Sequence, residues 1–173
     1  KKTEEITSKK VGYFFAEEEA FKTVTEITGA GTSRHPLTFI LEAADDIAYL
    51  VADMEDAIGK GVISFRDVRE FLIENLSTDV YNAPHSVHTR EVLTTIDEKV
   101  FSVNRFFVDL RDKLIDGARH NFVNHYDEIM AGTFNQDLFK NSWAEDLYVI
   151  LRRLSEEKIY DHKGILRLEI AGY

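Results

Sequence analysis

The sequence of 173 residues contains no cysteine and only two prolines. Without cysteine the chain can form neither a disulfide nor a thiolate metal site, so any metal ion must take oxygen or imidazole ligands. Two prolines and nine glycines favour long helices over many turns. No apolar run reaches the roughly 18 residues of a transmembrane helix, and no secretion signal is recognisable. These absences favour a helical protein without a membrane partner.

Acidic residues outnumber basic residues by 31 to 21, which gives a formal net charge of −10. A chain this acidic lacks the broad basic surface by which proteins bind nucleic acid. An anionic substrate is still compatible, because a bound cation and a few lysines or arginines can neutralise a polyphosphate locally. The length and the hydrophobic content of 44% are typical of one globular domain, so we treat residues 1–173 as a single helical region.

The segment from His35 to Gly61 has the clearest helical pattern in the chain. Pro36 suits the first helical turn, where its missing N–H is not needed, and the glycines Gly59 and Gly61 end the run. Apolar residues recur at near-helical spacing and predict a stripe that packs into a core: Phe39, Ile40, Ile47, Leu50, Val51, Met54 and Ile58.

Another face of this helix carries two carboxylates and a phenol. Asp45, Tyr49 and Asp53 stand at positions i, i+4 and i+8, so their side chains project from successive turns of one side. Small neighbours such as Ala44 and Ala48 leave room for a metal ion or a sugar to approach. The alternative is an ordinary solvated acidic face, with the Tyr49 ring in the core and its hydroxyl at the rim.

The remaining helices are predicted from apolar periodicity and from capping signals. The sequence Ser64-x-x-Asp67 approximates a capping box, and the helix that begins at Ser142 carries Trp143 and has a buried apolar side. The apolar residues near the end of the chain alternate and suggest a short extended segment. The predicted helices are 16–28, 65–76, two between 89 and 130 with a break near 101–104, and 142–158, and the predicted extended segment is 165–170. The predicted fold class is therefore all-α with a short extended segment near the C-terminus.

Four blocks of sequence carry a resemblance to a known family. They are Lys10-Val11-Gly12-Tyr13-Phe14 with Glu17 and Glu18, Glu42-Ala43-Ala44-Asp45-Asp46-Ile47-Ala48-Tyr49 with Ala52-Asp53-Met54-Glu55-Asp56-Ala57, Ala131-Gly132-Thr133-Phe134-Asn135, and Arg167-Leu168-Glu169-Ile170-Ala171-Gly172-Tyr173. In this order they resemble the deoxyguanosinetriphosphate triphosphohydrolases, a branch of the HD-domain phosphohydrolases. The resemblance implies an HD-domain-like helical bundle that hydrolyses deoxynucleoside triphosphates, dGTP above all, to deoxynucleoside and tripolyphosphate.

The same resemblance implies roles for individual residues. Asp45 matches the last protein ligand of a divalent metal of the Mn²⁺ or Mg²⁺ type. Tyr49 would pack on the deoxyribose and crowd a 2′-hydroxyl, while Asp53 would accept a hydrogen bond from the 3′-hydroxyl. Lys10 would contact the triphosphate, for which a flexible ammonium is suitable, and Glu169 would lie near the base.

One part of the family pattern is missing, because none of the six histidines is followed by aspartate. The chain also begins without methionine. We therefore expect it to be the C-terminal portion of a longer polypeptide whose upstream segment carries the remaining metal ligands and any catalytic histidine or glutamate. As partners, the resemblance implies a homo-oligomer in the cytoplasm, with nucleic acid only as an effector.

Two other interpretations stay open at this point. The chain could be part of another HD phosphohydrolase that acts on a different nucleotide, or a helical interaction domain whose acidic helix binds nothing. Arg105 and Arg111 could face a phosphate, although neither matches a family arginine. For His120 and His125 we expect capping or exposed positions.

Overall fold

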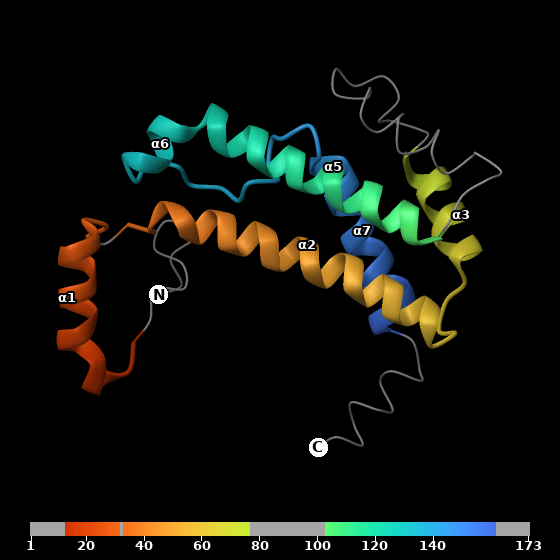
Figure 1. Ribbon diagram of the computed structural model, residues 1–173, viewed down its shortest axis with the longest axis horizontal. Helices are drawn as coiled ribbons and strands as arrows, with labels where there is room; N and C mark the ends of the chain where they lie inside the picture. The colour runs from red at the N-terminus through yellow and green to blue at the C-terminus, as the bar shows by residue number, and fades with distance from the viewer. Residues whose placement is uncertain (1–12, 32, 77–102, 162–173) are drawn as a thin grey trace.

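The computed structural model describes residues 13–31, 33–76 and 103–161, and all regular structure within these residues is helical (Figure 1). A 3₁₀ turn (Phe15–Glu17) precedes the helices α1 (Glu18–Thr28), α2 (Pro36–Gly59), α3 (Phe65–Leu76), α5 (Val103–Asn124), α6 (Tyr126–Met130) and α7 (Glu145–Leu154), and α7 continues as the π-helical segment η4 (Ser155–Tyr160). The all-α prediction is confirmed over the described residues. The predicted extended segment at 165–170 lies outside them.

The long helix α2 has the ends that the sequence predicts. The Nδ1 atom of His35 accepts a hydrogen bond from the backbone N–H of Leu37 at 3.2 Å, and Pro36 occupies the first turn. The helix stops at Gly59, and two residues later Gly61 takes a φ of 69°, a conformation that costs glycine little. Local sequence therefore sets both ends of the element that carries the candidate site.

The core lies where α2 runs side by side with α5, with α7 crossing both helices (Figure 1). Val51 and Met54 of α2 are fully buried there. At one point α5 comes so close to the loop before α7 that a Cβ built on Gly117 would lie 2.3 Å from the Cβ of Ala144. The other fully buried large side chains are Phe106, Phe107, Leu110 and Leu114 of α5, Ile129 of α6, Phe134 and Phe139 of the following loop, Leu147 and Leu151 of α7, and Leu72 of α3.

One predicted core residue of α2 is exposed. Ile40 is 44% exposed, whereas its neighbour Phe39 is only 3% exposed. Ile40 shares a side of α2 with the exposed residues Leu37 and Ala44, and no described helix covers that side. The apolar stripe is therefore narrower than the sequence predicts at the beginning of the helix.

The capping box before α3 is present as predicted. The backbone N–H of Asp67 donates to Oγ of Ser64 at 3.1 Å, and the backbone N–H of Ser64 donates to Oδ2 of Asp67 at 2.8 Å. The Ser64 hydroxyl also donates to Oδ2 of Asp67, at 2.7 Å. The backbone N–H of Ser64, followed by this hydroxyl, stabilises the ionised carboxylate and so lowers the pKa of Asp67.

Helix boundaries further along the chain differ in part from the predictions. Helix α5 begins at Val103, within the predicted break, but the helix expected before it lies in 77–102, outside the described residues. A break that the sequence did not predict occurs at His125, between α5 and α6, where Asn124 and His125 are both weak helix formers. The predicted helix at 142–158 is observed from Glu145 to Tyr160 through α7 and η4, and Trp143 is buried as expected. The π-helical segment ends at Tyr160, and a turn follows at Asp161.

Helix α1 stands apart from this core and projects beside the start of α2 (Figure 1). It buries none of its own residues, and Tyr13 stacks on Phe21 with 4.6 Å between ring centroids. Among the described residues, no helix is long and apolar enough to cross a membrane.

Candidate functional site

The three residues singled out on α2 lie along one open side of the helix. Asp45 and Tyr49 are exposed and Asp53 is half-buried. The alanines beside them, Ala44 and Ala48, are exposed as well, so no large side chain of α2 covers this strip. Tyr49 is 60% exposed, which rules out the alternative that its ring belongs to the core of the described residues.

A small cavity of about 90 Å³ opens at the N-terminal end of this strip, between α2 and the loop before α7. Four carboxylates line it, together with Phe39, Ala43, Leu138 and Phe139. The four carboxylates belong to Glu42, Asp45, Asp46 and Asp137. Four negative charges around so small a space must be stabilised by donors or by a cation.

Asp46 is held by a tyrosine from another helix. The hydroxyl of Tyr148, on α7, donates a hydrogen bond to Oδ2 of Asp46 at 2.8 Å. The Tyr148 ring stacks on Phe139 with 4.1 Å between centroids and 6° between planes, and the Arg152 guanidinium lies 5.9 Å from its centroid. Burial, and then the hydrogen bond to Asp46, raises the pKa of Tyr148 well above its usual value. Tyr148 therefore stays a hydroxyl donor in a fixed position.

Two more of the four carboxylates have partners of their own. The Oδ1 atom of Asp137 accepts hydrogen bonds from the backbone N–H groups of Phe139 and Lys140, both at 2.8 Å. Glu42 forms an ion pair with Arg34, whose side chain is almost completely buried. The lone pairs and charges of these acids are thus largely satisfied within the protein.

Asp45 is the exception in this group. Across residues 13–31, 33–76 and 103–161 it has no hydrogen-bond or ion-pair partner. Its carboxylate is exposed on the open side of α2, one turn from Tyr49. Asp45 is therefore the carboxylate of the four that remains free to bind an incoming ligand.

Asp53 has a partner that the sequence did not indicate. The hydroxyl of Tyr160, the last residue of η4, donates to Oδ2 of Asp53 at 2.5 Å. Burial, and then this hydrogen bond, raises the pKa of Tyr160 to about 12. No periodicity in the sequence links residues 107 positions apart. Tyr160 and Tyr148 are thus the two side chains at this site that sequence reasoning missed.

The described residues do not form a complete metal site. Among them, no group of three or more histidine, aspartate or glutamate side chains is arranged to hold a metal ion. A single free carboxylate such as Asp45 fits one position in the oxygen-rich coordination that Mg²⁺ and similar ions prefer.

The other predicted candidates are placed as follows. Arg105 pairs with Asp109 at 2.9 Å, and Arg111 pairs with Glu55 at 3.3 Å, so both arginines already have carboxylate partners. His120 is exposed, as expected. His125 stands at the N-cap position of α6, but its side chain is half-buried and makes no capping hydrogen bond, so the expectation is wrong for His125. Lys10 and Glu169 lie outside the described residues.

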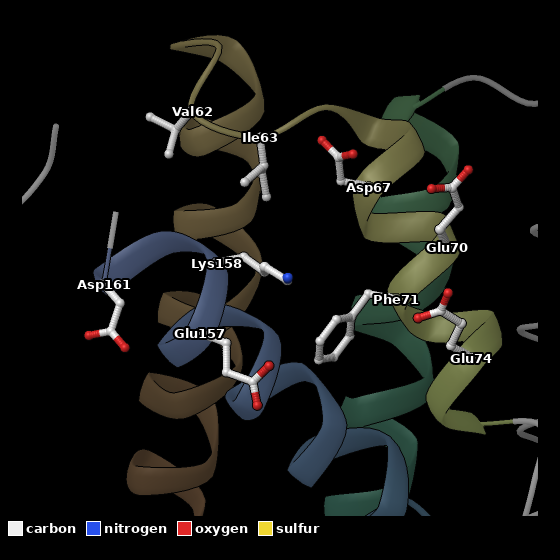
Figure 2. Close-up of a pocket in the computed structure, with 9 residues that line it drawn as sticks. All are labelled: Val62, Ile63, Asp67, Glu70, Phe71, Glu74, Glu157, Lys158 and Asp161. Atoms are coloured by element: carbon white, nitrogen blue, oxygen red, sulfur yellow. The ribbon is translucent and has the colours of Figure 1, made fainter. Parts of the chain in front are cut away.

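A larger cavity of about 540 Å³ lies between α3 and η4 (Figure 2). Lys158 is the cation that lines it, beside the ring of Phe71. Figure 2 shows three carboxylates on α3 and two on the opposite wall, namely Asp67, Glu70, Glu74, Glu157 and Asp161. Five carboxylates against one ammonium repel a polyphosphate, so this cavity does not suit a nucleotide.

Comparison with known proteins gives relatives that align with nearly the whole chain, although no family model matches it. The chain is 41% identical over 176 aligned residues to the deoxyguanosinetriphosphate triphosphohydrolase-like proteins of Listeria monocytogenes and Listeria innocua, an alignment that covers 97% of the chain and 37% of each relative. It is 32% identical to the deoxyguanosinetriphosphate triphosphohydrolase of Salmonella arizonae, over 95% of the chain and 34% of the relative. The chain thus spans about a third of the length of the curated relatives it matches. Along nearly its whole length, it is homologous to the deoxyguanosinetriphosphate triphosphohydrolases and their relatives.

Proposed function

We propose that this chain is part of a metal-dependent hydrolase that converts deoxynucleoside triphosphates, dGTP above all, into deoxynucleoside and tripolyphosphate. The relative from Salmonella arizonae is named for dGTP triphosphohydrolysis. The observation that carries the proposal is Asp45, which alone of the four acids around the small cavity has no partner among the described residues. The family resemblance assigns a metal ligand to this same position.

We further propose that residues 1–173 form the C-terminal part of an HD-domain-like helical bundle. The relatives extend well beyond the aligned region, since the chain covers 37% or less of their length. The other metal ligands, a histidine and a His-Asp pair, together with any catalytic histidine or glutamate, would belong to an upstream segment. Homo-oligomerisation is part of the same proposal and can be measured by light scattering.

In this proposal Asp45 supplies one oxygen ligand to a divalent ion of the Mn²⁺ or Mg²⁺ type. Such an ion, when bound, polarises the α-phosphate and lowers the pKa of an attacking water. Asp45 can take this role without giving up an existing hydrogen bond, because it has no partner among the described residues. Lys10 would hold the triphosphate as a flexible point charge.

The sugar would bind along α2 beyond Asp45. The exposed ring of Tyr49 can pack against a deoxyribose and occupy the space that a 2′-hydroxyl would need. Asp53 uses one oxygen to accept the Tyr160 hydroxyl, which leaves its other oxygen free to accept a 3′-hydroxyl. Tyr160 would thereby fix the direction in which Asp53 faces the sugar. Glu169 would bind the base.

The decisive experiment replaces Asp45 with alanine in the whole protein. Turnover of dGTP with Mn²⁺ or Mg²⁺ is followed by chromatography of deoxyguanosine and tripolyphosphate. We expect Asp45→Ala to abolish metal-dependent turnover with an unchanged circular dichroism spectrum, because the substitution removes a ligand and no core contact. The matched control is Asp56→Ala, which removes an exposed acid of the same helix whose partner is Lys60 at 3.0 Å.

The outcomes separate the interpretations. Wild-type turnover by Asp45→Ala would reject the metal-ligand assignment. Turnover of a different phosphorylated nucleotide in place of dGTP would identify another phosphohydrolase. No turnover of any nucleotide with either metal ion would favour a helical interaction domain.

A further inference from the structure

We propose that Tyr148 is a positioning residue that reserves Asp45 for the metal ion by holding the adjacent carboxylate of Asp46 away from it. This inference rests on the proposed function and deepens it. It explains how the fold selects Asp45 over Asp46 as the metal ligand. The sequence of the pair does not decide this, because the two side chains are identical.

The selection is needed because Asp45 and Asp46 are chemically equivalent. Successive residues of an α-helix are about 100° apart around the axis, and both carboxylates line the same small cavity and are exposed. Rotation about the side-chain torsions of an aspartate can turn its carboxylate toward the neighbouring residue. A divalent cation at the cavity could therefore attract either carboxylate, or both.

Tyr148 gives the two carboxylates different environments. Its hydroxyl donates to Oδ2 of Asp46 at 2.8 Å, whereas Asp45 has no partner among the described residues. The hydrogen bond joins α7 to α2 across 102 positions of sequence. A hydrogen bond to an ionised acceptor is stronger than one between neutral groups, so Asp46 is held in one orientation.

The position of the donor is itself fixed by packing. Tyr148 is 8% exposed, and its ring lies parallel to Phe139 at 4.1 Å between centroids. Arg152 covers the ring at 5.9 Å. A phenylalanine at position 148 can keep these ring contacts and lose the hydroxyl alone, which makes Tyr148→Phe a selective variant.

Removing the hydroxyl should weaken metal binding. Within the cavity that both residues line, the freed Asp46 carboxylate can turn toward Asp45. It then competes with Asp45 for the ion and repels the Asp45 carboxylate as a like charge. Loss of an outer hydrogen bond around a metal ligand typically reduces affinity by about 10- to 100-fold, and we expect about tenfold because Tyr148 acts through the neighbouring residue.

The test measures the binding of Mn²⁺ to the whole protein in the absence of nucleotide. Free Mn²⁺ is quantified by electron paramagnetic resonance during titration of wild type, Tyr148→Phe and Tyr126→Phe. Tyr126 is the matched control, because it is half exposed and its hydroxyl has no hydrogen-bond partner among the described residues. We expect the Kd for Mn²⁺ to rise about tenfold in Tyr148→Phe and to stay at the wild-type value in Tyr126→Phe.

A second pair of variants distinguishes positioning from general support of the fold. Asp46→Asn should bind Mn²⁺ as wild type does, because Asp46 is not a ligand in this proposal. Adding Tyr148→Phe to Asp46→Asn should have no further effect, because the neutral amide cannot compete for the ion. Thermal unfolding of each variant is measured in parallel.

Several results would overturn the inference. An unchanged or lower Kd in Tyr148→Phe would do so, and so would an equal rise of the Kd when Tyr148→Phe is added to Asp46→Asn. If Tyr148→Phe does not fold, Asp46→Asn alone tests the inference. A tenfold higher Kd for Mn²⁺ in that variant would make Asp46 a ligand and overturn it. Failure of the underlying function is recognised separately, by Asp45→Ala binding Mn²⁺ as tightly as wild type.

Discussion

The hydroxyl of Tyr160 lies 2.5 Å from Oδ2 of Asp53, which ties the end of η4 to the open side of α2. Tyr160 follows Tyr148 by twelve residues. In an ideal α-helix this separation would place the two side chains about 120° apart around the axis. The wider turn of the π-helix η4 reduces the rotation per residue and lets both tyrosines reach carboxylates of α2.

The first prediction concerns the pH dependence of stability and uses Tyr160→Phe. The pKa of Tyr160 is about 12 in the folded protein, against about 10 for an unperturbed tyrosine. The folded state therefore keeps a proton that the unfolded state loses. This stabilisation is complete below pH 10 and is lost as the pH rises from about 10 to about 12.

Urea denaturation of the chain between pH 8 and pH 12 measures the effect. Above pH 10 we expect the free energy of unfolding of wild type to fall more steeply with pH than that of Tyr160→Phe. The difference between the two slopes should correspond to at most about one bound proton. Tyr126→Phe is the control and should follow wild type. Parallel curves for wild type and Tyr160→Phe would show that the Asp53 hydrogen bond does not stabilise the neutral phenol.

The second prediction concerns the choice between deoxyribonucleotides and ribonucleotides. In the whole protein, Tyr49→Ala should lower the ratio of kcat/KM for dGTP over GTP by roughly tenfold or more, because space opens beside C2′. Tyr49 is 60% exposed, so its removal should leave the melting temperature nearly unchanged. Tyr49→Phe keeps the ring and should keep the discrimination. A dGTP/GTP ratio at the wild-type value in Tyr49→Ala would remove Tyr49 from the sugar site.

The third prediction concerns base preference and Glu169. A carboxylate can accept hydrogen bonds from N1–H and the exocyclic amino group of guanine, whereas adenine offers an acceptor at N1. In the whole protein, Glu169→Gln should therefore lower the preference for dGTP over dATP by about 1.5–3 kcal/mol. Steady-state kinetics with both nucleotides measure this, with Glu169→Asp as the variant that keeps the charge. If Glu169 is instead an exposed acid on an alternating segment, Glu169→Gln should keep the wild-type ratio of kcat/KM for dGTP over dATP.

The fourth prediction concerns the packing of α5 against the loop before α7. A Cβ at Gly117 would lie 2.3 Å from the Cβ of Ala144, so at least one of the two backbones would have to shift. Gly117→Ala should destabilise the chain by about 1–3 kcal/mol, measured by urea denaturation. Gly59→Ala is the control, because nothing lies within 4 Å of a Cβ there. Similar stabilities of the two variants would contradict the close approach.

Local sequence was sufficient to predict the elements that carry the site. Apolar periodicity predicts α2, and the residues at its ends set where it begins and stops. The spacing of Asp45, Tyr49 and Asp53 is enough to place the three side chains on one side of the helix. These features depend on interactions within a few residues of each other, which is why a single sequence contains the information for them.

Only the tertiary structure decided which of these side chains are free. Asp46 and Asp53 receive hydrogen bonds from residues more than a hundred positions away, and Ile40 is exposed because no described helix covers its side of α2. Helical periodicity states which way a side chain points, but not which distant element meets it. That outcome depends on how α7 and η4 cross α2, and it separates Asp45 from the equivalent carboxylate next to it.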